Sequence, residues 1–277
     1  KVTGAFSVSR GRLISTGGES IASDPVRIME SFYLCSKTGK KLSDSLKEKI
    51  KSNLVRINNR TRNSAGCVHH FLRILGSPRV YETLREMHEL GVLGRFLPEF
   101  GALSLLVVHE PYHMYTVDEH TLVAIRNLEA LRASKYRNLS DLHLIFNEVQ
   151  DHETLFMAIL FHDIGKAAGR RHEEEGYKRL KGIMERFNLD ADRRARVEFI
   201  VRNHILMSKT ALRREPEDPE VIAAFADAVG NEENLKAIYL VTYADMSAVN
   251  PAFYNPWKAY LLRELYENTL KHLAGIR

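Results

Sequence analysis

A chain of 277 residues can bury a full hydrophobic core, as one large domain or as two small ones. Hydrophobic residues make up 44% and charged residues 27% of the sequence, as is usual for globular proteins, and no apolar stretch approaches the ~20 residues of a membrane span. The net charge of +5 is unevenly divided, because residues 1–108 carry 17 Lys and Arg against 9 Asp and Glu, while residues 109–277 carry 23 against 26. The second part therefore lacks the positive charge of a nucleic-acid-binding surface, and neither nucleic acid nor membrane is expected as a partner.

The sequence begins at Lys1 without an initiator methionine or a basic-then-apolar signal pattern, so we expect a fragment of a longer protein. The two cysteines, Cys35 and Cys67, are too few for a disulfide framework and lack the spacing of metal ligands. These features favour a reducing, cytoplasmic location.

Residues 1–23 form an N-terminal segment with β-prone pieces at Ala5–Val8 and Arg12–Ile14, which predicts a short hairpin. At Asp24-Pro25 the pattern becomes helical, with an N-cap followed by proline at the first helical position. Further helices are predicted behind Ser43, over His69–Leu75 and over Val80–Leu90. We therefore expect a smaller helical linker subdomain over residues 24–108.

Apolar residues recur at helical spacing through residues 109–277. The predicted helices cover Val117–Ala133, Glu153–Asp163, Tyr177–Phe187, Arg193–His204, Pro219–Val229, Asn234–Ala248 and Pro256–Leu273. The connections are mostly short, which favours antiparallel packing, although residues 134–151 are less regular and are expected to be a variable insertion. The predicted fold class is all-α, a helical bundle preceded by the smaller helical subdomain and the β-prone N-terminal segment.

One predicted helix is nearly all apolar over Leu155–Phe161 and delivers the pair His162-Asp163 just before Gly165. A helix that is apolar on every side is a buried helix, and Gly165 is expected to end it in a left-handed conformation. An ionisable pair at the end of a buried helix is costly unless a cation or internal hydrogen bonds satisfy it. From the pair alone, a metal site and a hydrogen-bonded helix end are equally compatible with the sequence.

Imidazoles and carboxylates suited to a divalent cation follow one another through the second half of the chain. They are His120, His162, Asp163, His172, His204 and Asp245. This order resembles the HD superfamily of metal-dependent phosphohydrolases, in which a His, a later His-Asp pair and a final Asp stand on separate helices. His120, His162, Asp163 and Asp245 match that pattern. His172 and His204 stand where some members carry two further histidines for a second ion.

Longer segments are similar to one family within that superfamily, the bacterial PII-protein uridylyltransferase/uridylyl-removing enzymes. These segments are Gly91–Gly101, Pro111–Leu122, Arg202–Ser208, the pair Arg213-Arg214 and Asn255–Ala259. The resemblance runs from about residue 70 to 270 and implies an HD domain over residues 109–277, with a nucleotidyltransferase domain ahead of this region and ACT domains behind it. Because no Gly-Ser is followed by the Asp-x-Asp that a transferase needs for its metals, we expect the hydrolytic part alone.

The resemblance implies release of UMP from a tyrosine of the uridylylated PII signalling protein, a step in nitrogen regulation. Mn²⁺ or Mg²⁺ is expected as the metal, with Fe, Ni, Zn or Co as alternatives, and Asp163 would bridge two ions if two bind. A metal-bound water would attack phosphorus, and Lys166 would offset the negative charge on the phosphoryl oxygens. A solvated Lys166 that completes the helix end is the alternative interpretation.

Substrate contacts are expected from His113, Arg202, Arg213 and Arg214, each of which is also compatible with an ordinary surface position. Two other functions remain open at this stage. The same metal site would serve a hydrolase of free nucleotides or cyclic dinucleotides, as in other HD proteins. It would equally serve a regulatory module that binds metal or nucleotide without turnover.

Overall fold

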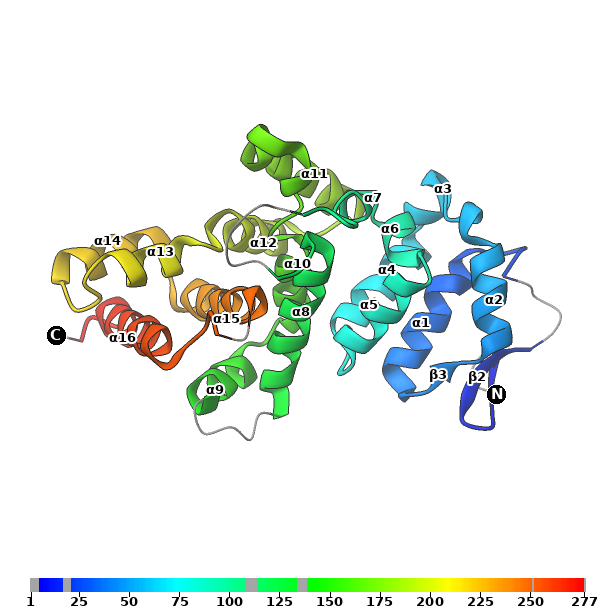
Figure 1. Ribbon diagram of the computed structural model, residues 1–277, viewed down its shortest axis with the longest axis horizontal. Helices are drawn as coiled ribbons and strands as arrows, with labels where there is room; N and C mark the ends of the chain where they lie inside the picture. The colour runs from blue at the N-terminus through cyan, green and yellow to red at the C-terminus, as the bar shows by residue number, and fades with distance from the viewer. Residues whose placement is uncertain (1–4, 17–20, 108–113, 134–138, 251, 277) are drawn as a thin grey trace.

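The computed structural model describes residues 5–16, 21–107, 114–133, 139–250 and 252–276, with the backbone alone at 170–173. It shows an elongated arrangement of helices in which the N-terminal elements lie at one end and α16 (Pro256–Leu273) lies at the other (Figure 1). The all-α fold class is confirmed, with one small sheet near the N-terminus. No helix in the described part of the chain is long and apolar enough to cross a membrane.

The β-prone N-terminal segment forms the predicted hairpin. Strand β1 (Phe6–Ser9) pairs antiparallel with β2 (Arg12–Ser15), and the turn residues Arg10 and Gly11 both have positive φ, as in a type I′ hairpin turn. A third strand, β3 (Lys41–Leu42), pairs parallel to β2 and was not predicted. Two residues are too few to show alternation, so only their tertiary contact with β2 makes them a strand.

The next elements form the N-terminal helical half. They are α1 (Val26–Thr38), α2 (Asp44–Ser52), η1 (Leu54–Arg56), α3 (Asn59–Arg62), α4 (Ala65–Leu75), α5 (Val80–Glu89), α6 (Val92–Phe96) and α7 (Pro98–Gly101). Helix α4 begins four residues earlier than the prediction, because the Ser64 side chain accepts the backbone N–H of Cys67 and caps the helix there. Gly91 follows α5 with a φ of 76°, in agreement with its predicted place after that helix.

The remaining elements build the second half. They are α8 (Val117–Ala130), η2 (Leu131–Ala133), α9 (Ser140–Glu148), α10 (His152–Phe161), η4 (Lys166–Arg171), α11 (His172–Arg186), α12 (Ala191–Asn203), α13 (Leu206–Arg213), α14 (Pro219–Val229), α15 (Glu232–Val249) and α16. Two helices in the described part of this half were not predicted. Helix α9 lies in the stretch expected to be irregular, and α13 follows α12 after a bend at His204 and Ile205, with no capping side chain to mark its start.

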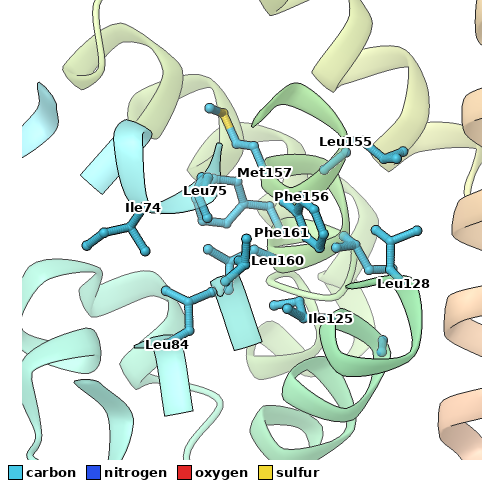
Figure 2. Packing of buried hydrophobic residues seen from close by; sticks show 14 of the residues in the cluster. Ile74, Leu75, Leu84, Ile125, Leu128, Leu155, Phe156, Met157, Leu160 and Phe161 are labelled. Carbon is cyan, nitrogen blue, oxygen red and sulfur yellow. The ribbon is translucent and has the colours of Figure 1, made fainter. Parts of the chain in front are cut away.

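Helix α10 is the centre of the molecule, and its burial on every side is confirmed. Each residue of Leu155–Phe161 is at most 1% exposed. Figure 2 shows Ile74 and Leu84 approaching this helix from the N-terminal half, and Ile125 from α8. Because α10 is fixed by packing on all its faces, the residues that follow it are held at one defined place in the interior.

The conformation predicted for Gly165 is wrong. Gly165 is not among the described residues with positive φ, because the chain continues from it into the short helix η4. The glycine serves a close approach instead. A Cβ atom on Gly176 of α11 would lie 3.0 Å from the Gly165 Cα, so the two backbones touch where α11 crosses the end of α10.

An aromatic cluster connects the two halves of the chain. The Phe187 ring, after α11, lies 5.7 Å from the Phe71 ring, 6.1 Å from Phe96 and 6.4 Å from Phe161. These partners come from α4, α6 and α10, so one side chain contacts elements far apart in the sequence. The predicted domain boundary between residues 108 and 109 falls outside the described residues, and the division into 1–23, 24–108 and 109–277 stays a prediction.

Candidate metal centre

Four of the six predicted ligands converge just beyond the end of α10. His120 comes from α8, His162 and Asp163 follow α10, and Asp245 comes from α15. The His120 Nε2 atom lies 2.9 Å from Asp245 Oδ1 and 3.9 Å from Asp163 Oδ2. The His162 Nε2 atom lies 3.2 Å from Asp163 Oδ2 and 3.6 Å from Asp245 Oδ1. One ligand atom from each of His120, His162 and Asp245 lies within 4.8 Å of the other two.

The backbone orients the histidine rings. The His162 Nδ1–H group donates to the carbonyl of Ile159 at 2.7 Å, so Nε2 faces the carboxylates. The His204 Nδ1–H group donates in the same way to the carbonyl of Val201 at 2.7 Å, and its ring lies 5.3 Å from that of His162. Hydrogen bonds of this kind fix the tautomer in which Nε2 carries a lone pair for a metal ion.

Charge at the cluster is divided between ionised carboxylates and a protonated imidazole. His120, His162 and Asp163 are at most 5% exposed. Burial opposes the protonation of His162, but Asp163 and Asp245 outweigh it and raise the pKa of His162 to about 10. Burial also opposes the ionisation of Asp163, yet His162 and Lys166 hold the pKa of Asp163 well below its usual range. The pKa of Asp245 is likewise low despite burial, because His120 and His162 contact it. The buried carboxylate of Asp163 and the partly buried carboxylate of Asp245 therefore require positive charge beside them.

The chemistry of these residues fits a divalent cation. The His162 Nε2 atom is buried and is misaligned for a hydrogen bond to any described residue, although Asp163 lies near it. Two imidazoles and a carboxylate whose ligand atoms lie together, with a second carboxylate beside them, are a normal donor set for a borderline or hard divalent ion. An ion there would replace the proton on His162 as the charge that stabilises the carboxylates. The assignment of each residue as a ligand stays a prediction.

A cavity of about 850 Å³ opens from the cluster toward the surface. It is lined by residues after α10 and by residues of α11, α12, α13 and α15, with Phe253 at one edge. Lys166 lines it and its Nζ lies 2.8 Å from Asp163 Oδ2, so this ammonium group is part of the cluster. A cavity of this size is within the range of small-ligand sites.

Of the other predicted site residues, some line the cavity and others do not. Arg202 lines the cavity, with its guanidinium carbon 4.7 Å above the Tyr177 ring. Arg213 and Arg214 are exposed at the end of α13 and are not among the residues that line the cavity. His113 and the side chain of His172 lie outside the described residues. The roles of all five stay predictions.

Among the cavity residues that the sequence did not predict are Tyr177, Lys209 and Phe253. They come from α11, from α13 and from the segment before α16. Lys209 follows His204 by five residues on a helix that was not predicted, and no motif connects Tyr177 or Phe253 to the cluster. Only the packing of these elements brings the three side chains to one cavity.

Replacement of His204 by Ala will lower the number of metal ions bound per chain by about one, if two ions are bound. The His204 ring lies beside His162 and its Nδ1–H is already held, so it is placed to ligate through Nε2. Elemental analysis of the purified variant tests this, with His272→Ala on the exposed end of α16 as the control. An unchanged metal content in a folded His204→Ala protein would reduce His204 to a supporting role.

Metal affinity will rise with pH, because an ion and a proton compete for His162. Below the raised pKa of about 10 the metal-free cluster holds a proton that the ion must displace. The apparent Kd for Mn²⁺ should therefore increase by about tenfold for each unit by which the pH falls, through the neutral range. Calorimetric titration in buffers of different ionisation enthalpy measures both the Kd and the proton release. A Kd independent of pH, without proton release, would contradict the expectation.

Comparison with known proteins agrees with this geometry. Residues 6–96 match the family model described as the uridylyltransferase GlnD third domain, and residues 117–232 match the HD domain model. Two curated proteins named bifunctional uridylyltransferase/uridylyl-removing enzyme, from Caulobacter vibrioides strains NA1000 / CB15N and ATCC 19089 / CIP 103742 / CB 15, are each 36% identical to the chain over 269 residues. The alignment covers 96% of this chain and 29% of each relative, so the chain spans less than a third of their length.

Proposed function

Because the chain belongs to the family of bifunctional uridylyltransferase/uridylyl-removing enzymes, of which it carries the third domain and the HD domain, we propose that it is a metal-dependent phosphodiesterase that removes UMP from uridylylated PII. The observation that carries the proposal is the cluster of His120, His162, Asp163 and Asp245, of which the last three line an open cavity. The reaction would regulate nitrogen metabolism through the state of PII.

The residues of the cluster have distinct parts in this reaction. His120, His162, Asp163 and Asp245 would hold one divalent ion, with His204 beside them for a second, and Mn²⁺ or Mg²⁺ suits these nitrogen and oxygen donors. A bound ion supplies a water of lowered pKa and polarises the phosphoryl group. The Ile159 carbonyl keeps the His162 ring in its ligating orientation. Lys166, held by Asp163, presents its ammonium group to the cavity, where it would stabilise negative charge on the phosphoryl oxygens.

The walls of the cavity suit a nucleotide joined to an aromatic ring. Lys166, Arg202 and Lys209 give positive charge for a phosphate group, while Met246 and Phe253 give apolar surface. A uridylylated tyrosine has both characters, since its phosphodiester lies between a base and a phenol ring. A volume of about 850 Å³ accommodates such a group together with the ion.

The proposal is tested by incubating uridylylated PII with the chain and Mn²⁺ and following the mass of PII. We expect the mass to fall by one UMP, and we expect no UMP addition from UTP, because the chain has no transferase motif. An Asp163→Asn variant serves as the inactive control. Rapid cleavage of a cyclic dinucleotide without any change in the mass of PII would assign the site to free nucleotides. No turnover of PII, nucleotides or a generic phosphodiester would make the chain a non-catalytic module.

A further inference from the structure

A second cavity, of about 570 Å³, lies in the N-terminal helical half. It is lined by Arg62 of α3, by residues from α5 to Ser104 just after α7, and by Ile57. We call it the arginine pocket, defined by Ile57, Arg62, His88, Gly91, Gly94, Arg95, Pro98, Gly101 and Ser104. None of these residues lines the cavity of the metal centre, so the two sites can be tested separately.

The arginine pocket carries positive charge without a neutralising acid. The residues that line it include the partly buried Arg62 and the exposed Arg95, and no Asp or Glu. The Arg62 Nε atom is buried and makes no hydrogen bond within the described part of the chain. A buried donor without an acceptor is unfavourable, so the Nε–H group of Arg62 is available to a hydrogen-bond acceptor on a ligand.

The acids near the arginine pocket are already engaged by other groups. Glu99 of α7 forms an ion pair with Arg186 at 3.4 Å. Burial lowers the pKa of Arg186, and Glu99 raises it in part. The positive charge of Arg62 also lowers the pKa of Arg186. Asp118 contacts the His88 Nε2 atom at 3.3 Å and accepts the backbone N–H of Glu119 at 3.0 Å. Neither Glu99 nor Asp118 therefore forms an ion pair with Arg62 or Arg95.

The shape of the pocket depends on its glycines. A Cβ atom on Gly101 would lie 2.9 Å from the carbonyl oxygen of Gly94, so α6 and α7 pack backbone to backbone. With glycine at positions 91, 94 and 101, no side chain from these positions fills the space between the helices. His88 also lines the pocket, and its ring lies edge-on to that of Phe100 at 5.8 Å.

We propose that the arginine pocket binds the phosphate group of a small phosphorylated molecule. Guanidinium groups bind phosphate through paired, charge-assisted hydrogen bonds, and the buried Nε of Arg62 offers one such donor. Two positive charges match a phosphate dianion better than they match a single carboxylate. The volume of about 570 Å³ accommodates a phosphate that carries a small organic group.

The test is calorimetric titration of the full, Mn²⁺-loaded chain with inorganic phosphate and with UMP, at an ionic strength fixed by KCl, alongside hydrogen exchange. We expect saturable binding that protects amides of α3, α6 and α7. We expect Arg62→Gln and Arg95→Gln each to weaken that binding by about tenfold or more. Arg60→Gln is the matched control, because Arg60 is exposed on the same short helix and does not line the pocket.

The two probes distinguish the sources of the phosphate. Tighter binding of UMP with the same protected amides would identify a nucleotide ligand, and equal binding would identify the phosphate alone. Phosphate bound at the metal centre would instead protect the amides of residues 162–166 from hydrogen exchange. Its affinity would be unchanged in both arginine variants. Binding that is absent, that is unchanged in both folded arginine variants, or that is matched by succinate would overturn the proposal.

Discussion

Replacement of Asp163 by Asn will lower kcat/KM for phosphodiester hydrolysis by about 10³-fold or more and will weaken metal binding. The carboxylate lies within 3.9 Å of His120 and 3.2 Å of His162, and it holds Lys166 at 2.8 Å. The change therefore removes a ligand, a compensating charge and the partner of Lys166 together. A factor of 10³ corresponds to about 4 kcal/mol of transition-state stabilisation.

The measurement is a steady-state assay on a generic bis-phosphodiester with Mn²⁺, together with the metal content of each variant. Asp227→Asn is the control, because Asp227 is an exposed residue of α14. Circular dichroism verifies that Asp163→Asn remains folded. Wild-type turnover and a full metal content in Asp163→Asn would remove Asp163 from the site.

Replacement of Phe187 by Ala will lower the free energy of unfolding by about 3 to 5 kcal/mol. The ring is 3% exposed and is in contact with aromatic rings from α4, α6 and α10. Its removal would leave a cavity where the two halves of the chain meet, and packed rings on three sides cannot collapse to fill it. The Arg186 guanidinium, which lies over the Phe187 ring at 5.5 Å, would lose that contact as well.

Chemical denaturation followed by circular dichroism measures this loss. Trp257→Ala is the control, because Trp257 is an aromatic residue of α16 with 65% exposure, and we expect it to cost less than about 1 kcal/mol. Phe161 belongs to the same cluster and directly precedes His162, so we also expect weaker metal binding in Phe187→Ala. A loss of stability no larger than that of Trp257→Ala would contradict the role of Phe187 at this joint.

The part of the fold around α10 was predictable from local sequence. A run of seven apolar residues, Leu155–Phe161, leaves no polar face for solvent, so the helix had to be buried and the pair after it had to lie in the interior. A helix cap such as Ser64 acts on residues close to it in the sequence, so the start of α4 is also a local property. By contrast, β3 exists only because β2 lies beside it.

The convergence of the site could not be derived from spacing. His120 and Asp245 are 125 residues apart, and nothing local requires their side chains to meet. The resemblance to the HD superfamily predicted that they would lie together, and the helix packing of α8 with α15 accounts for it physically. The arginine pocket was predicted neither from spacing nor from the resemblance. No sequence motif marks Arg62, and the burial of its Nε and its place beside residues of α6 and α7 depend on tertiary packing.

Anomalous diffraction from crystals grown with Mn²⁺ tests the metal centre most directly. We expect a peak within coordination distance of His120, His162, Asp163 and Asp245, at the floor of the cavity that Lys166 and Arg202 line. A second peak beside His204 would indicate two ions. Manganese bound elsewhere on the protein, with no peak among these four residues, would contradict the assignment of the cluster as the metal centre.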